Sequence, residues 1–157
     1  MSNDMKLVSD SHDAEELMEN RFLSFLINDE LYAIHIEDVT EIVGYQPITS
    51  IPNSKDYIQG IINLRGLIIP VVSIRYNFGL EQIEADEKTC IIIIKINDND
   101  IGLIADEVSE VIRIDDYLHK PAPATNKGHS GRFLKSIANI DNKIFQILDL
   151  SKLLFIE

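Results

Sequence analysis

The chain has 157 residues, of which 45% are hydrophobic and 25% are charged, a composition typical of a soluble globular protein of one domain or two small halves. Its formal net charge of −12 at pH 7 repels phosphate backbones and anionic lipid, which argues against a nucleic-acid partner or direct insertion into a membrane. The single cysteine excludes an intramolecular disulfide, and with neither a secretory leader nor ~20 consecutive apolar residues in view, we expect a cytoplasmic protein.

The N-terminal part of the chain changes character at Arg21. Residues 1–20 are polar and acidic, and we expect an extension that is partly disordered or forms a short helix. Apolar runs over residues 21–27 and 31–36 flank the turn sequence Asn28-Asp29-Glu30, a pattern typical of a β-hairpin. The β-branched residues of 36–43 favour a turn that leads into a strand.

A second hairpin is predicted over residues 61–74, which read IINLRGLIIPVVSI. Gly66 can adopt the positive φ that a tight turn needs, and Arg65 beside it places a charge at the tip. Pro70 has no N–H to donate to a β-ladder, so its strand is expected at a sheet edge or at a bulge. An acidic linker follows over residues 81–88.

Residues 89–96, which read TCIIIIKI, carry the clearest strand pattern of the chain. A nearly continuous apolar run indicates burial on both faces of a strand, or on one face plus a second packed element. Residues 97–100 then predict a turn, and residues 101–105 the returning strand.

The C-terminal part begins with a Pro- and Gly-rich loop over residues 120–131. Residues 134–148 predict a third hairpin, whose two-residue turn Asp141-Asn142 suits positive φ. A short apolar helix is expected over residues 150–155, with Asp149 as its N-cap.

The two halves of the sequence resemble each other. Residues 28–43 align with residues 97–112 without a gap, and residues 61–74 align with residues 137–150. Such a repeat predicts two similar β subdomains, although chance similarity between hairpins is the alternative. Units of ~60 residues with about five short strands would each close into a small barrel and so remove exposed sheet edges.

We therefore predict a mainly all-β fold with two five-stranded barrels packed together, short helices and a C-terminal helical turn. The expected subdomains span about residues 21–86 and 87–157, and strands can exchange between them.

No catalytic or metal site is visible in the sequence. The four histidines lack a metal-binding spacing and are predicted to be unconnected: His12, His35, His119 and His129. Cys90 begins a strand and is expected to be a buried small hydrophobe without a nearby base. An enzyme on a β-barrel scaffold is the remote alternative, and it would require a pocket that joins His35, Cys90 and a carboxylate.

The remaining candidates are exposed turns on a rigid body, which favours a protein-interaction module. These turns carry Glu41, Arg65 and Lys120. In the aligned second half, Asp141-Asn142 stands where the first half has Arg65-Gly66. The shared architecture therefore does not require Arg65, which places partner recognition on the first of the two aligned hairpins.

The stretch INLRGLIIPVVSIRYNFGL at residues 62–80 resembles the signature of CheW-like chemotaxis coupling proteins. YAIHIEDVTEIV, ITSIPNSKDYIQG, IGLIADEVSEVI, the KPAP loop and SIANIDNKIFQILDLSKLL extend the resemblance over about residues 21–155. Ser73 stands where the family usually has Asp, and Ser54 where Pro is common. Ser73 is still expected to cap the short helix that follows it.

The resemblance implies two interlocking SH3-like β-barrels and an adaptor without enzymatic activity or cofactor. Such adaptors bridge the cytoplasmic tips of chemoreceptors (methyl-accepting chemotaxis proteins) to the regulatory domain of the histidine kinase CheA, and are recruited to membrane receptor arrays. A paralogue that serves a pilus or surface-sensing pathway is the alternative with the same fold.

The resemblance also implies site residues by position. Receptor binding falls on Val39, Glu41, Gly60 and Arg65. Kinase binding falls on Lys120, Pro121 and Pro123.

Overall fold

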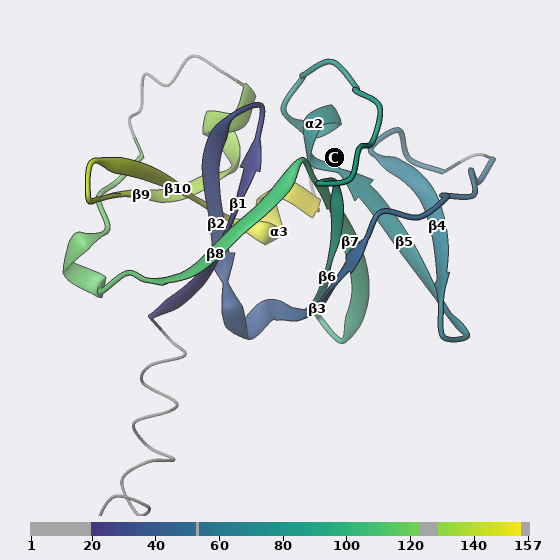
Figure 1. The fold of residues 1–157 in the computed structure, drawn as a ribbon, viewed down its shortest axis with the longest axis horizontal. Helices are drawn as coiled ribbons and strands as arrows, with labels where there is room; N and C mark the ends of the chain where they lie inside the picture. The colour runs from purple at the N-terminus through teal and green to yellow at the C-terminus, as the bar shows by residue number, and fades with distance from the viewer. Residues whose placement is uncertain (1–19, 53, 123–128, 155–157) are drawn as a thin grey trace, which may run out of the picture.

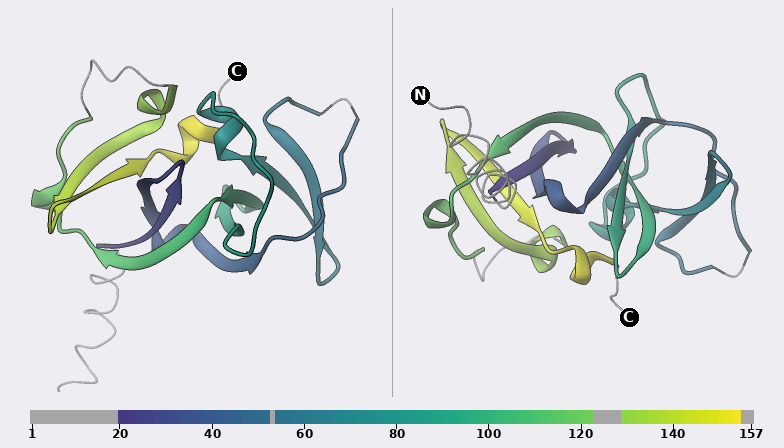
Figure 2. Two further views of the ribbon diagram at one scale, coloured as in Figure 1. Left: turned by 45° about the horizontal axis from the view of Figure 1, so that its top comes forward. Right: turned by 90° about the horizontal axis from the view of Figure 1, so that it is seen from below.

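The computed structural model describes residues 20–52, 54–122 and 129–154, which form two five-stranded sheets side by side (Figures 1 and 2). The first, called barrel 1, has the strand order β8 (Glu107–Arg113), β1 (Arg21–Ile27), β2 (Glu30–His35), β10 (Lys143–Leu148) and β9 (Leu134–Ile140). The second, called barrel 2, has the order β3 (Val39–Gly44), β6 (Cys90–Ile96), β7 (Asn99–Ala105), β5 (Leu67–Ser73) and β4 (Ile58–Leu64). The predicted mainly-β fold with two five-stranded units is confirmed.

Each sheet combines strands from both halves of the sequence. The β1–β2 hairpin lies in one sheet with β8, β9 and β10, whereas the β6–β7 hairpin lies in the other with β3, β4 and β5. Figure 1 shows β3 and β8 crossing between the sheets in opposite directions. Each sheet thus takes strands from both sides of the expected boundary near residue 86. We propose that residues 21–86 and 87–157 are repeats that fold by exchanging their first hairpins.

Four hairpin turns share one backbone geometry. Their first residues have φ between 51° and 54°, and their second residues between 65° and 89°. Positive φ at both central residues is the requirement of a type I′ turn, whose twist matches that of the flanking strands. The turns are Asn28-Asp29, Arg65-Gly66, Asn97-Asp98 and Asp141-Asn142.

The hydrophobic interior has three parts, two inside the barrels and one between them. In β6, Ile91 and Ile93 belong to the interior of barrel 2, whereas Ile92 and Ile94 belong to the cluster between the barrels, called the central core. All four side chains are at most 2% exposed, which confirms the predicted burial of this strand on both faces.

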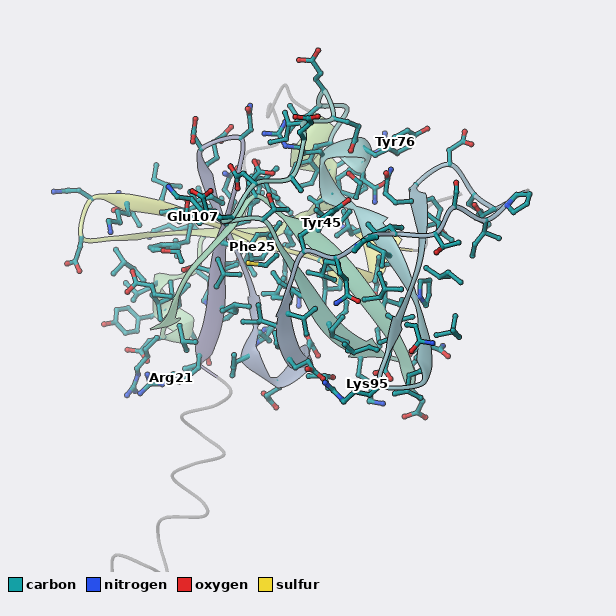
Figure 3. The ribbon with its side chains drawn as sticks, turned by 45° about the vertical axis from the view of Figure 1, so that its right-hand side comes forward. Arg21, Phe25, Tyr45, Tyr76, Lys95 and Glu107 are labelled. Atoms are coloured by element: carbon teal, nitrogen blue, oxygen red, sulfur yellow. The ribbon has the colours of Figure 1, made fainter. Side chains whose placement is uncertain are left out.

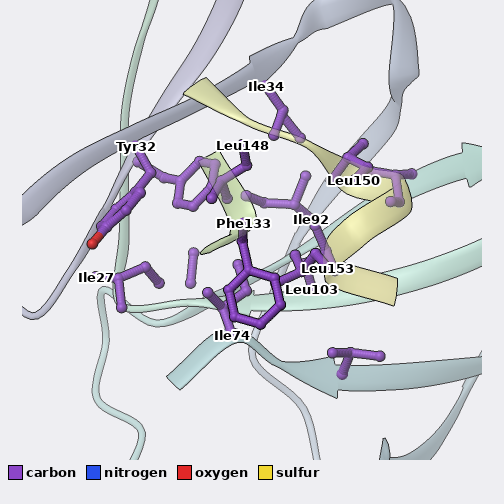
Figure 4. Packing of buried hydrophobic residues seen from close by; sticks show 14 of the residues in the cluster. Ile27, Tyr32, Ile34, Ile74, Ile92, Leu103, Phe133, Leu148, Leu150 and Leu153 are labelled. Atoms are coloured by element: carbon purple, nitrogen blue, oxygen red, sulfur yellow. The ribbon is translucent and has the colours of Figure 1, made fainter. Parts of the chain in front are cut away.

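Side chains from both sheets meet in the central core (Figure 4). Phe25 of β1 is fully buried there, and Figure 3 shows it inside the molecule, with Arg21 and Lys95 at the periphery. Two short helices cover the core: α2 (Ile74–Asn77) buries Ile74, and α3 (Leu150–Leu154) buries Leu150, Leu153 and Leu154.

Both helices begin at a capping side chain, as predicted. Ser73 Oγ accepts a hydrogen bond from the Tyr76 N–H at 3.2 Å. Asp149 Oδ1 accepts one from the Lys152 N–H, also at 3.2 Å. The 3-10 turns are η1 (Ile36–Asp38), η2 (Asp116–Leu118) and η3 (His129–Phe133).

Pro70 does not lie on an edge strand, so that interpretation of its strand is wrong. β5 is an interior strand between β4 and β7. Its parallel pairing with β7 starts only at Val71, and the adjacent bulge lies in β4, between Ile58 and Gly60. Pro70 is therefore accommodated where β5 has not yet begun to pair with β7.

Arg75 and Asp106 join the two barrels. Arg75 Nε and Nη2 donate to the two carboxylate oxygens of Asp106 at 2.9 and 2.8 Å, and its Nη1 donates to the Glu81 carbonyl. The same carboxylate accepts the N–H of Asn28 at 2.8 Å. Helix α2, the β7–β8 crossover and the β1–β2 turn thus meet at one ion pair, whose hydrogen bonds raise the pKa of Arg75 above its ordinary value.

We expect Asp106→Asn to lower the free energy of unfolding by about 2 kcal/mol, the usual range for hydrogen bonds to a charged group. The Arg75 and Asp106 side chains are only 12% and 19% exposed, so water replaces the lost contact poorly. Asp115→Asn, which breaks the more exposed Arg113–Asp115 pair, should cost less than about 1 kcal/mol. Equal losses in urea unfolding would contradict this role for Asp106.

Candidate protein-interaction site

The described residues hold no group of three metal-ligating side chains. Cys90 begins β6 as predicted but is half-buried rather than buried, and its thiol lies 3.2 Å from the Lys88 carbonyl. Two cavities lined by His35 do not have Cys90 among their lining residues, and the two residues belong to different sheets. In the described part of the chain, the helices are too short or too polar to cross a membrane.

Arg65 and Glu41 form an ion pair that connects the two edge strands of barrel 2. Glu41 lies on β3 and Arg65 in the β4–β5 turn, at opposite edges of the sheet order. Asn63 fixes the turn, since its Oδ1 accepts the Gly66 N–H at 2.9 Å. The Arg65 side chain is 68% exposed and that of Glu41 30%, so the guanidinium stays accessible from solvent.

Arg65 holds a backbone conformation that its residue type disfavours. Its φ is 52°, in the left-handed region that costs an L-residue roughly 1–2 kcal/mol. The equivalent positions in the other three hairpin turns are Asn28, Asn97 and Asp141, which tolerate this region well. A strained residue among unstrained equivalents is an observation that points to function.

Exposed apolar side chains accompany this ion pair. Leu67 and Ile68, which follow the turn on β5, are 57% and 60% exposed, and Ile42, which follows Glu41 on β3, is 42% exposed. Sequence reasoning assigned these residues to strands and missed their exposure. Two adjacent apolar residues at the start of a strand were the available signal, because alternation can bury only one of them.

Val39 and Gly60 take part in packing. Val39 is half-buried against the central core, and Gly60 is buried in β4 with φ of 154°. A Cβ at Gly60 would lie 2.2 Å from the Thr49 carbonyl oxygen. Thr49 and Ile61 exchange two backbone hydrogen bonds of 2.9 and 2.8 Å, so the chain before β4 runs directly over Gly60. Among the four predicted receptor-binding residues, the ion pair joins only Glu41 and Arg65.

Barrel 1 carries the equivalent surface without the guanidinium. Asp141 stands in place of Arg65, and Glu110 in place of Glu41. Val111 and Ile144, the equivalents of Ile42 and Ile68, are likewise exposed, at 45% and 55%. The two barrel ends therefore share exposed apolar residues but differ in charge.

Of the predicted kinase-binding residues, Lys120 and Pro121 are described, and Pro123 lies outside the described residues. The Lys120 main chain pairs with Ile137 of β9 through hydrogen bonds of 2.8 and 2.9 Å, which leaves the exposed side chain free to make other contacts. Figure 1 shows this segment on the barrel 1 side, away from the β4–β5 turn at the other end.

Comparison with known proteins places this fold in a family. A family model of the CheW-like domain matches residues 21–155. The chemotaxis protein CheW of Klebsiella aerogenes is 32% identical over 141 residues, which cover 90% of this chain and 85% of that protein. The chemotaxis protein CheW of Helicobacter pylori is 36% identical over 117 residues, which cover 74% and 70% of the two chains.

A solved structure supports the same assignment. The crystal structure of the scaffolding protein TtCheW from Thermoanaerobacter tengcongensis superposes with a TM-score of 0.80 at 37% identity. The superposition covers 89% of this chain and 90% of that one.

We expect Gly60→Ala to lower the free energy of unfolding by about 1–3 kcal/mol, the usual cost of overpacking, because its Cβ would clash with the Thr49 backbone. Gly44→Ala is the matched control, since a Cβ there would have nothing within 4 Å. If both variants unfolded at the wild-type urea concentration, Gly60 would not be needed for close packing of the chain.

Proposed function

The chain belongs to the CheW-like family of chemotaxis coupling proteins, and we propose that it is a non-enzymatic adaptor between chemoreceptors and a histidine kinase. In this proposal, one surface binds the cytoplasmic tip of a methyl-accepting chemotaxis protein and another binds the regulatory domain of CheA. The relatives are named as chemotaxis and scaffolding proteins, which does not favour a pilus or surface-sensing paralogue.

The left-handed conformation of Arg65 is the observation that carries the receptor site. A turn built for stability alone would have Asn or Asp here, as the other three hairpin turns do. The ion pair with Glu41 is exposed, and such pairs contribute only about 0–1 kcal/mol, too little to explain the arginine. We infer that Arg65 is retained for a contact with a partner.

The surroundings of Arg65 suit contact with a protein partner such as a receptor tip. Its contact with Glu41 uses the Nη2 nitrogen, and other donors of the planar guanidinium face solvent. These donors can bind a carboxylate or carbonyl oxygens, while Ile42, Leu67 and Ile68 supply apolar contact area. Val39 and Gly60 would act in the same site by fixing β3 and β4 beneath it.

The kinase contact is proposed for Lys120, Pro121 and Pro123. The backbone pairing of Lys120 with β9 holds the start of this segment on barrel 1. The proposed receptor site lies on barrel 2, so the two partners would occupy separate surfaces. An adaptor that links two partners needs this separation, and receptor binding would recruit the protein to membrane arrays.

The receptor site is tested with Arg65→Asn and Arg65→Glu, measured by co-sedimentation with membrane vesicles that carry a chemoreceptor from the same organism. Both variants should lose co-sedimentation. Arg65→Asn should keep the wild-type free energy of unfolding or raise it by up to about 1 kcal/mol, because Asn tolerates the left-handed turn.

The matched control is Arg113→Asn, which removes a half-exposed arginine that is likewise paired with a carboxylate. It should leave co-sedimentation intact. Unchanged binding of Arg65→Glu would remove Arg65 from the receptor site.

The kinase contact is tested with Lys120→Glu against the isolated kinase regulatory domain. We expect its affinity to fall about tenfold, or 1.4 kcal/mol, with receptor co-sedimentation unchanged. The control Lys95→Glu reverses an exposed lysine of barrel 2 and should bind the kinase like the wild type. If the two variants bound the kinase equally well, the contact would lie elsewhere.

A further inference from the structure

Two histidines that the sequence places far apart pack against the same buried phenylalanine. The rings of His35 and His119 have their centroids 4.3 and 5.4 Å from that of Phe22, which is 1% exposed. His119 Nδ1 also lies 2.8 Å from Ser136 Oγ. The prediction that the histidines are unconnected is therefore wrong for this pair, which comes together where β2 and the segment after η2 meet in barrel 1.

The fold itself does not require histidines at these positions. In barrel 2, the residue equivalent to Phe22 is Ile91 and the residue equivalent to His35 is Ile104. Thr49 and Lys120 make the same bridge to β4 and β9, so Ile48 is the equivalent of His119. Ile48 and Ile104 pack against the buried cluster of barrel 2 that contains Ile91. Two titratable rings thus replace two isoleucines in otherwise equivalent packing.

Burial opposes the protonation of His35. Its pKa is lowered from 6.5, first by burial and next by the positive charge of Lys135 on β9; His119 adds to the lowering. Asp38 and Glu37 of η1 act in the opposite direction without reversing it. A cavity of about 260 Å³ adjoins both histidines, and Asp116 of η2 also lines it. A proton on His35 would add a positive charge beside Lys135.

Both histidines are connected through the backbone to the proposed partner surfaces. His35 ends β2, and only the 3-10 turn η1 separates it from Val39 at the start of β3, the strand that carries Glu41. His119 directly precedes Lys120, and Ser136 directly precedes Ile137, which pairs with Lys120. A displacement of the Phe22 cluster would therefore reach β3 and the Lys120 segment within a few residues.

We propose that the Phe22–His35–His119 cluster is an acid-responsive element that weakens coupling when His35 becomes protonated. At neutral pH the uncharged His35 ring and the ring of His119 pack on Phe22 and hold η1 and Lys120 in place. In acid, repulsion between protonated His35 and Lys135 loosens this end of barrel 1 and shifts both attached segments. The effect on coupling rests on the proposed receptor and kinase contacts, whereas the effect on the fold does not.

The direction of the stability change follows from proton binding. The His35 pKa is lower in the folded chain than its ordinary value of 6.5, so below pH 6.5 the unfolded chain binds more protons. The stability contributed by neutral His35 is complete above pH 6.5. It falls as the pH decreases from 6.5 to the pKa of the folded state, and then levels off.

The first experiment needs no partner. Proton NMR titration of the full chain should give a midpoint for His35 below 6.5, and Lys135→Gln should move it upward by removing the repelling charge. Urea unfolding at pH 7.5 and 5.5 should show a smaller loss of stability for His35→Gln than for the wild type. The inference would be overturned if Lys135→Gln left the His35 midpoint unchanged. It would also be overturned if the wild type and His35→Gln lost the same free energy of unfolding between pH 7.5 and pH 5.5.

The second experiment measures receptor co-sedimentation and kinase affinity at pH 7.5 and 5.5. Between pH 7.5 and pH 5.5 the affinity of the wild type for both partners should fall several-fold. One linked proton can lower an affinity by at most about tenfold per pH unit. The affinity of His35→Gln should fall less than that of the wild type. Equal losses overturn the link to coupling. If the wild type bound neither partner at pH 7.5, the proposed function would be rejected. The NMR and unfolding results would then test the acid response of the fold by themselves. His119→Gln provides a second variant of the cluster if His35→Gln does not fold.

Discussion

The architecture depends on the hydrophobic contact between the two barrels. β6 sends alternate side chains into the interior of barrel 2 and into the central core, and β1 sends Leu23, Phe25 and Ile27 into the central core and Phe22 into barrel 1. Burial of one large aliphatic side chain contributes roughly 1.5–3 kcal/mol, and the central core draws such side chains from both sheets. Because each sheet contains strands from before and after residue 86, neither sheet can form from one half of the chain alone.

Arg75 and Asp106 add a directional contact to this nondirectional core. The hydrophobic contact brings the barrels together, while the two parallel hydrogen bonds between guanidinium and carboxylate fix the crossover against helix α2. The Asn28 N–H ties the tip of the β1–β2 hairpin to the same carboxylate. The relative position of the barrels matters for an adaptor, because its partners would bind surfaces on different barrels.

The internal repeat makes the functional differences visible. Equivalent hairpin turns in the two barrels share backbone geometry, and departures from the repeat are candidates for function. Arg65 differs from Asp141 in charge and in tolerance of the turn conformation. His35 and His119 differ from Ile104 and Ile48 in that they can be protonated. Arg65 lies in the proposed receptor surface, whereas the two histidines lie at the start of the segments that lead to both proposed surfaces.

The sequence by itself determined the hairpins, their turns, the helix caps and the repeat, because all of these depend on residues close together in the chain. Asn or Asp at positive φ, the apolar run of β6 and the capping oxygens of Ser73 and Asp149 are local signals. The long CheW-like motifs also fixed the family. Only the tertiary structure decided which strands share a sheet, since β1–β2 and β6–β7 would form equally good hairpins in either sheet.

The tertiary structure also decided which distant side chains meet. The Arg65–Glu41, Arg75–Asp106 and His35–His119 pairs join residues far apart in sequence, and nothing in local composition marks them as neighbours. The same holds for Gly60. Only glycine fits at this position because the Thr49 backbone passes where a Cβ would lie. Local sequence specifies elements through short-range hydrogen bonding and periodicity, whereas exposure and contact depend on how those elements pack.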